Sequence, residues 1–104
     1  VVHLGTNGNI EPDDLTAMMD ALAEVPQVLL LTIDVDRSWT EGNNALIFDA
    51  ASTYPNASVL YWADLADSCP GDCFQSDGFH LRPDGQKYYA ELIDGALEAL
   101  EAPA

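Results

Sequence analysis

The segment Val28-Leu29-Leu30-Leu31-Thr32-Ile33 indicates the fold class most clearly. It carries no charge, it is too short for a typical helix, and Pro26 precedes it while Asp34 follows it. A continuous apolar run of this length is typical of a parallel β-strand that is buried on both faces. We therefore expect this segment to be a central strand of a parallel sheet.

Segments with helical and with strand character alternate on both sides of this run. Pro12 suits the first position of a helix, and Pro26 and Pro55 end the apolar periodicities that precede them. We expect strands at 1–4 and 59–62, helices at 12–25, 43–54 and from Pro83 onward, and a loop at 63–82. Alternation of this kind predicts an α/β fold, a three-layer α/β/α arrangement around a parallel sheet.

Composition limits the partners. With 104 residues, 48% of them apolar, the chain has room for one domain. Eighteen acidic residues against three basic ones give a net charge of −15, which argues against nucleic acid or an anionic membrane surface as a partner. No apolar run is long enough to cross a bilayer, and the first residues do not resemble a signal peptide.

The first four residues have the composition of a β-strand, and the sequence shows no residues before them. Val1-Val2-His3-Leu4 opens the chain without an initiator Met. We expect residues 1–104 to be a single partial domain, the C-terminal portion of a larger one, whose N-terminal strands are missing. An unpaired strand at this edge predicts that the isolated chain is marginally stable or pairs with other copies.

Chemistry in a parallel sheet gathers at the carboxyl ends of the strands, which here means the loops 5–9, 34–40 and 63–82. In Asp77-Gly78-Phe79-His80, a carboxylate three residues before an imidazole can accept the Nδ1–H and leave Nε2 free to take a proton. In Gly5-Thr6-Asn7-Gly8, the Asn7 amide could donate to a developing oxyanion. Taken singly, each stretch could also be a plain surface loop or turn.

Several other residues, polar and aromatic, could have either a structural or a functional role. Cys69 and Cys73 favour a short-loop disulfide over two free thiols, with a metal site less favoured still; a disulfide implies an extracytoplasmic setting. Asp34 and Asp36 lack the further ligands of a cation site, so no metal is expected. His3 is expected in the core, Trp62 in packing, and Trp39 either lining a pocket or covering the core.

Together, and in this order, the two loops resemble signature blocks of the SGNH hydrolase superfamily. Gly5-Thr6-Asn7 matches its G-x-N block and Asp77-Gly78-Phe79-His80 its D-x-x-H block; Val1–Gly8, Asn44 and Asp77–Gly85 look like the SGNH domain of bacterial membrane-linked O-acyltransferases. The resemblance implies that His80 is the general base, Asp77 its orienting partner and Asn7 an oxyanion-hole donor. The G-D-S block that holds the nucleophilic Ser of this superfamily has no match, so this chain contains no nucleophile.

The resemblance implies part of an enzyme that transfers an acyl group to a cell-surface polysaccharide or peptidoglycan hydroxyl, or to water as an esterase. Its partners would be an acyl donor, a sugar hydroxyl, the upstream SGNH segment and a membrane acyltransferase domain, and it needs no cofactor. The chain alone is expected to be inactive. The alternative is a non-catalytic acidic α/β binding module or a degenerate paralogue; a flavodoxin-like or receiver domain fits less well, because there is no phosphate-binding loop.

Overall fold

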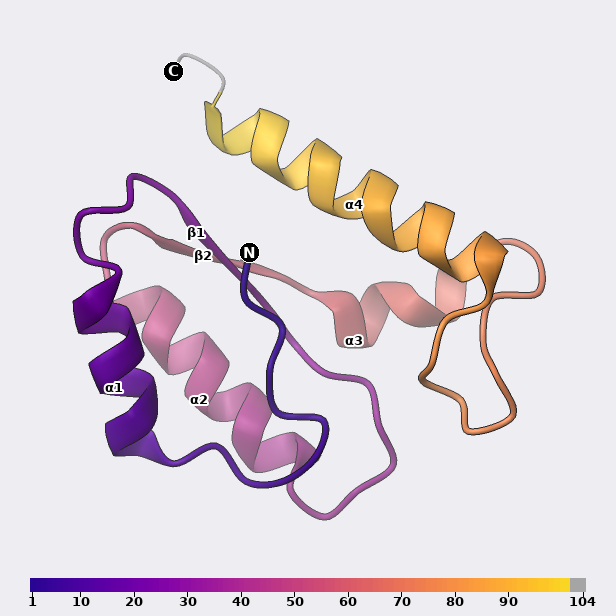
Figure 1. Ribbon diagram of the computed structural model, residues 1–104, viewed down its shortest axis with the longest axis horizontal. Helices are drawn as coiled ribbons and strands as arrows, with labels where there is room; N and C mark the ends of the chain where they lie inside the picture. Colours follow the sequence, from indigo (N-terminus) through magenta and orange to yellow (C-terminus); the bar gives the residue numbers. More distant parts are fainter. Residues whose placement is uncertain (102–104) are drawn as a thin grey trace. The chain divides into compact units, whose positions relative to one another are not determined.

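The computed structural model describes residues 1–101 and divides the chain into two compact units, Val1–Ala63 and Asp64–Ala104. In chain order the elements are α1 (Pro12–Ala21), β1 (Val28–Leu31), α2 (Thr40–Thr53), β2 (Ala57–Leu60), α3 (Trp62–Leu65), a short 3₁₀ turn (Ala66–Ser68) and α4 (Pro83–Glu101) (Figure 1). The predicted α/β class is confirmed: helices accompany a small parallel sheet, a set of elements compatible with a partial α/β/α domain.

The sheet of the first unit is built on the apolar run. β1 and β2 pair in parallel, with Val28 opposite Ala57 and Leu31 opposite Leu60. All four residues of β1 are buried, which confirms the prediction of a strand covered on both faces, whereas the residues of β2 are half-buried.

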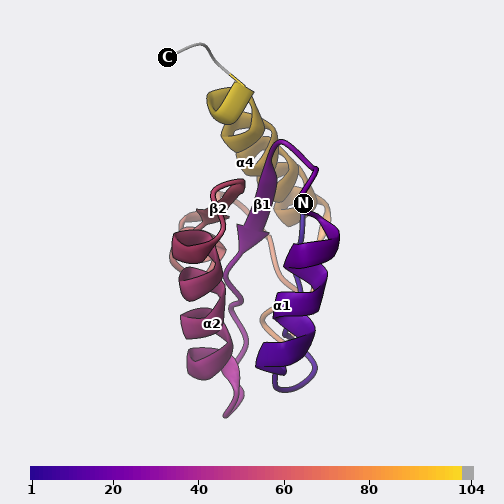
Figure 2. The same cartoon turned by 90° about the vertical axis from the view of Figure 1, so that its left-hand side faces the viewer.

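The core of the first unit lies on one face of β1. Met19 of α1 and Ile47 and Ala50 of α2 form one buried cluster with Val28 and Leu30. Side chains two residues apart in a strand share a face, so both helices cover the same side of the sheet. Figure 2 shows α1 and α2 next to each other below β1.

The predicted strand at 1–4 is reduced to a single bridge between Val2 and Leu30. The Val2 N–H donates to Leu29 O at 2.8 Å, and Val2 O accepts from Leu31 N–H at 3.0 Å. Val1 and Leu4 are 62% and 59% exposed and only Val2 pairs, so the expectation of a strand over residues 1–4 is wrong. The backbone turns at Gly5, whose φ is +108°, directly after this segment, so its pairing with β1 stays limited to Val2.

Several predicted boundaries also move. α1 ends at Ala21 rather than near Val25, because the Asn56 side-chain amide donates to the carbonyls of Leu22 (3.0 Å) and Val25 (2.8 Å) and stabilises a turn there. α2 begins at Thr40 instead of near Asn43.

The strand predicted at 59–62 lies at Ala57–Leu60 instead. Trp62 is buried and begins α3, so its predicted packing role stands, but its predicted place in a strand is wrong. The expected loop at 63–82 therefore opens with helical turns. α4 begins at Pro83 as predicted.

Candidate functional site

The Asp77–His80 stretch lies at the tip of a short hairpin in the second unit. Phe74 and Leu81 form an antiparallel bridge, Gln75 N–H donates to His80 O at 2.8 Å, and Gly78 N–H donates to Gln75 O at 3.0 Å. Gly78 has a φ of +83°, a conformation that side-chain-bearing residues rarely adopt. The turn therefore brings Asp77 back towards His80.

The Asp77 carboxylate makes three contacts, two of them with His80 and one with Phe79. Its Oδ2 lies 2.5 Å from His80 Nδ1, while its Oδ1 accepts the backbone N–H groups of Phe79 and His80, both at 3.0 Å. These bonds, the one from the Phe79 backbone first, lower the pKa of Asp77 to about 2. An ionised carboxylate has no proton to donate, so Nδ1 carries the hydrogen and Nε2 of the neutral ring is an acceptor.

The ring of His80 is available to a substrate. Its side chain is 70% exposed, against 37% for Asp77. The Phe79 ring lies beside it, with the ring centroids 4.5 Å apart. The arrangement can take a proton at Nε2 and stabilise the resulting positive charge through Asp77.

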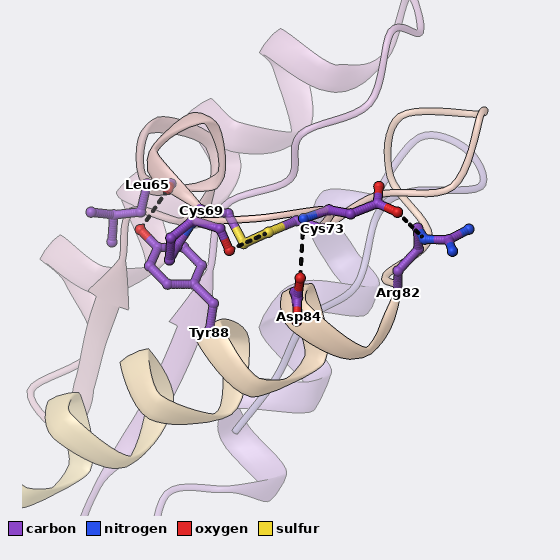
Figure 3. Close-up of a disulfide and its surroundings, with 8 residues drawn as sticks. Leu65, Cys69, Cys73, Arg82, Asp84 and Tyr88 are labelled. Carbon is purple, nitrogen blue, oxygen red and sulfur yellow. Dashed lines mark hydrogen bonds and ion pairs between the residues drawn. A yellow bond between two sulfur atoms is a disulfide. The ribbon is translucent and has the colours of Figure 1, made fainter.

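A disulfide and the first turn of α4 fix the base of this hairpin. Cys69 and Cys73 form a disulfide, as the sequence favoured. Figure 3 shows this disulfide with the side chains of Tyr88, Asp84 and Arg82 around it. Asp84 Oδ2 accepts the backbone N–H of residue 72 at 3.1 Å, and Arg82 N–H donates to Cys73 O at 2.8 Å. Asp77 and His80 therefore lie on a loop whose base is constrained by a disulfide and by hydrogen bonds to the start of α4.

Two further contacts hold the same region. Arg82 Nε forms an ion pair with Asp72 at 2.9 Å, and the Tyr88 hydroxyl donates to Leu65 O at 2.8 Å. Gly85 is buried against this loop: a Cβ at residue 85 would lie 2.2 Å from Cys73 O. The Pro83-Asp84-Gly85 sequence therefore has a local structural role beyond starting the helix.

Asn7 belongs to the first unit, in the loop that follows Val2. Its side chain is exposed, and the loop from His3 to Ile10 lines a shallow, open hollow. Gly5 has a φ of +108°, and a Cβ there would lie 3.0 Å from both Asn43 Nδ2 and Ile10 Cδ1, so glycine is required. Asp77 and His80 are brought together in one unit, and Asn7 lies in the other.

Two side chains that the sequence analysis did not assign to this loop hold it. Asn43, which is 2% exposed, donates to the carbonyls of Gly5 (2.9 Å) and Gly8 (2.8 Å) and accepts the N–H of Ile10 (2.8 Å). Trp39 Nε1 donates to Thr6 O at 3.3 Å, so this ring packs on the loop. A polar residue on the buried side of a predicted helix was the one signal that pointed to Asn43.

Asn44, part of the family resemblance, has a different task. Its side chain accepts the N–H of Ile33 at 2.8 Å and donates to the carbonyl of Ile33 at 3.1 Å. The side-chain amide of Asn44 thereby satisfies the backbone N–H and C=O of Ile33, as a neighbouring strand would, just beyond the end of β1. This contact orients the start of the loop 34–40.

Other polar residues have ordinary structural roles. Two serines that lie outside any G-D-S block are in regular elements: Ser52 lies in α2 and donates to Phe48 O, and Ser58 lies in β2. His3 is half-buried, and burial lowers the pKa of its ring. Within residues 1–101, no three His, Cys, Asp or Glu side chains gather in a way that could hold a metal ion, and no helix is long and apolar enough to cross a membrane.

The chain is similar to part of several bacterial O-acetyltransferases. It is 33% identical over 98 residues to O-acetyltransferase OatA of Staphylococcus aureus (strain NCTC 8325 / PS 47) and 30% identical over 97 residues to peptidoglycan O-acetyltransferase OatA of Listeria monocytogenes. A protein of Bacillus subtilis named putative peptidoglycan O-acetyltransferase YrhL is 26% identical over 99 residues.

These matches cover nearly all of this chain and a small part of each relative. They extend over 93% to 95% of this chain, but over only 15% or 16% of the relatives' own lengths. No protein-family profile matches the chain. The similarity therefore associates it with one segment of proteins named as O-acetyltransferases.

Proposed function

We propose that the chain is the C-terminal part of an SGNH-type acyl-transfer domain. His80 is its general base, Asp77 the residue that orients the base, and Asn7 an oxyanion donor; the nucleophilic Ser lies outside this chain. One observation carries the proposal: an exposed imidazole whose Nδ1 lies 2.5 Å from an ionised carboxylate, which leaves Nε2 as an acceptor.

The first half-reaction acylates the serine. The Ser oxygen adds to the carbonyl carbon of the acyl donor while its proton passes to Nε2 of His80, and the carbonyl electron pair becomes an oxyanion. The Asn7 amide and backbone N–H groups stabilise that oxyanion. When the carbonyl re-forms, the bond to the leaving group breaks and His80 returns the proton to it.

The second half-reaction removes the acyl group. His80 takes the proton of an incoming hydroxyl, whose oxygen attacks the acyl-serine, and the serine leaves with that proton. A sugar hydroxyl gives O-acylation and water gives hydrolysis. The names of the relatives support acetyl as the acyl group and peptidoglycan, or a similar cell-surface polysaccharide, as the acceptor.

Asp77 supports the base electrostatically. With a pKa of about 2 it stays ionised at neutral pH, so it stabilises the imidazolium that forms in both half-reactions. The chain has three basic residues against eighteen acidic ones, and this balance agrees with an uncharged sugar hydroxyl as the acceptor.

The location follows from the same chemistry. Peptidoglycan lies outside the cytoplasmic membrane, and a disulfide persists in an oxidising compartment. We place the domain outside the cytoplasm, attached to a membrane acyltransferase domain of the longer protein.

The test compares the longer protein with the 104-residue chain on an activated acetyl ester. The longer protein should turn over, Asp77→Asn should lower its kcat about 10⁴-fold, and the chain alone should not exceed buffer. Residues encoded upstream should contain Gly-Asp-Ser after a strand. Turnover by the chain alone, or an upstream sequence without that block, contradicts the proposal; the latter favours a non-catalytic binding module.

A further inference from the structure

The loop that carries Asn7 is held from inside by one buried amide. Asn43 gives both side-chain hydrogens to the carbonyls of Gly5 and Gly8, and its oxygen accepts the N–H of Ile10. It is the largest polar side chain among the fully buried residues described. A buried amide with all three contacts to a single loop is a costly group unless the loop keeps its shape.

These contacts decide which way the peptide groups face. No peptide bond among residues 1–101 is cis, so each C=O points opposite to the N–H of the next residue. With the Gly5 and Gly8 carbonyls turned towards Asn43, the N–H groups of Thr6 and Asn9 point away from it. Trp39, which donates to Thr6 O, does the same for the N–H of Asn7.

The outward N–H groups have no partner inside the described part of the chain. Across residues 1–101, no hydrogen bond involves the backbone N–H of Thr6, Asn7, Gly8 or Asn9. On the side that faces away from Asn43, the loop therefore offers N–H donors and not the Gly5 and Gly8 carbonyl oxygens, and Asn7 in the same loop is exposed. A carbonyl oxygen facing a developing oxyanion would repel it, whereas N–H groups stabilise it.

We infer that Asn43 is a positioning residue of the oxyanion hole: it turns the Gly5 and Gly8 carbonyls inward and so presents the backbone N–H groups of the loop beside the Asn7 amide. This inference rests on the proposed function. Asn43 touches neither the substrate nor the reacting atoms, and it acts through the loop conformation alone.

The diagnostic variant is Asn43→Asp. A carboxylate at residue 43 still accepts the N–H of Ile10, but it cannot donate to the two carbonyls and repels them. Asn56→Asp is the matched control, because Asn56 also donates to two carbonyls, those of Leu22 and Val25, at the end of α1. If Asn43→Asp does not fold, Asn43→Ser, which keeps one donor, replaces it.

Two measurements separate positioning from stability. In the 104-residue chain, nuclear magnetic resonance order parameters of residues 5–9 should fall from about 0.85 towards 0.6 in Asn43→Asp and stay unchanged in Asn56→Asp. In the longer protein, kcat on an activated acetyl ester should fall about 10²-fold in Asn43→Asp, with KM within about threefold of wild type. Asn56→Asp should retain kcat.

The outcomes distinguish the two proposals. Unchanged order parameters, an unchanged kcat, or an equal loss of kcat in Asn56→Asp would overturn the role of Asn43 while the acyl-transfer function stands. A wild-type longer protein that transfers no acyl group would overturn the proposed function and, with it, the positioning role.

Discussion

Replacing Gly85 by Ala tests whether the start of α4 holds the His80 hairpin. The new Cβ would lie 2.2 Å from Cys73 O and 3.1 Å from Leu81 Cδ2. Non-bonded carbon and oxygen do not approach within 3.0 Å, so the helix and the hairpin must separate by at least about 0.8 Å. The obstructing atom belongs to the backbone, so no side-chain rotation relieves the contact.

The size of the effect follows from two opposing contributions. Overpacking a tight site costs about 1–3 kcal/mol, and a backbone contact places Gly85→Ala at the upper end. Ala in a helix gains up to about 1 kcal/mol over Gly, so the net loss in the free energy of unfolding is about 2 kcal/mol. Gly95→Ala in the same helix meets nothing within 4 Å and should gain about 0.5–1 kcal/mol.

Urea unfolding followed by circular dichroism measures both variants. With a slope of about 1.5 kcal/mol/M, the midpoint of Gly85→Ala should lie about 2 M below that of Gly95→Ala, with wild type between them. A Gly85→Ala midpoint at or above that of wild type would refute the close packing of α4 against the hairpin.

Three further results are expected. Hydrogen bonds hold the pKa of Asp77 in the folded state at about 2, below its ordinary 3.8, so its contribution to stability is complete above about pH 4 and lost as the pH falls through 2. The urea midpoints of wild type and Asp77→Asn should therefore differ at pH 6 and converge near pH 2. A difference that stays constant with pH would contradict this. The Cys69→Ser/Cys73→Ser variant should lose about 2 kcal/mol in the free energy of unfolding, and the amide hydrogens of its hairpin should exchange faster while those of β1 keep their protection. Unchanged exchange rates in the hairpin would show that the disulfide does not hold it in place. The 1–4 edge has partners on one side, so sedimentation velocity of the isolated chain should show dimers or larger species, and a stable monomer with a sharp melting transition would count against that expectation.

The sequence predicted best what local chemistry determines. β1 was recognisable because its apolar run is continuous, and α4 because Pro83 precedes a helical stripe. The contact between Asp77 and His80 was accessible for the same reason, since the two residues are three positions apart and Gly78 permits the bend.

The misplaced features depend on distant residues. The end of α1 is set by Asn56, 34 residues beyond Leu22, and no local pattern announces that contact. Asn43 reaches Gly5 across 38 residues, so its place on the buried side of a helix could mark it as unusual but could not identify the loop that it holds. The segment 1–4 has the composition of a strand, but its pairing depends on β1, more than 20 residues away, and only Val2 reaches it.

Labelling of the longer protein by a serine-directed fluorophosphonate tests whether His80 is the general base. We expect rapid labelling of a single upstream serine in wild type and at least about a 10³-fold slower reaction in His80→Ala, because the serine proton then has no acceptor. Equal labelling of wild type and His80→Ala, or no labelling of either, would contradict the assignment of His80 as the general base.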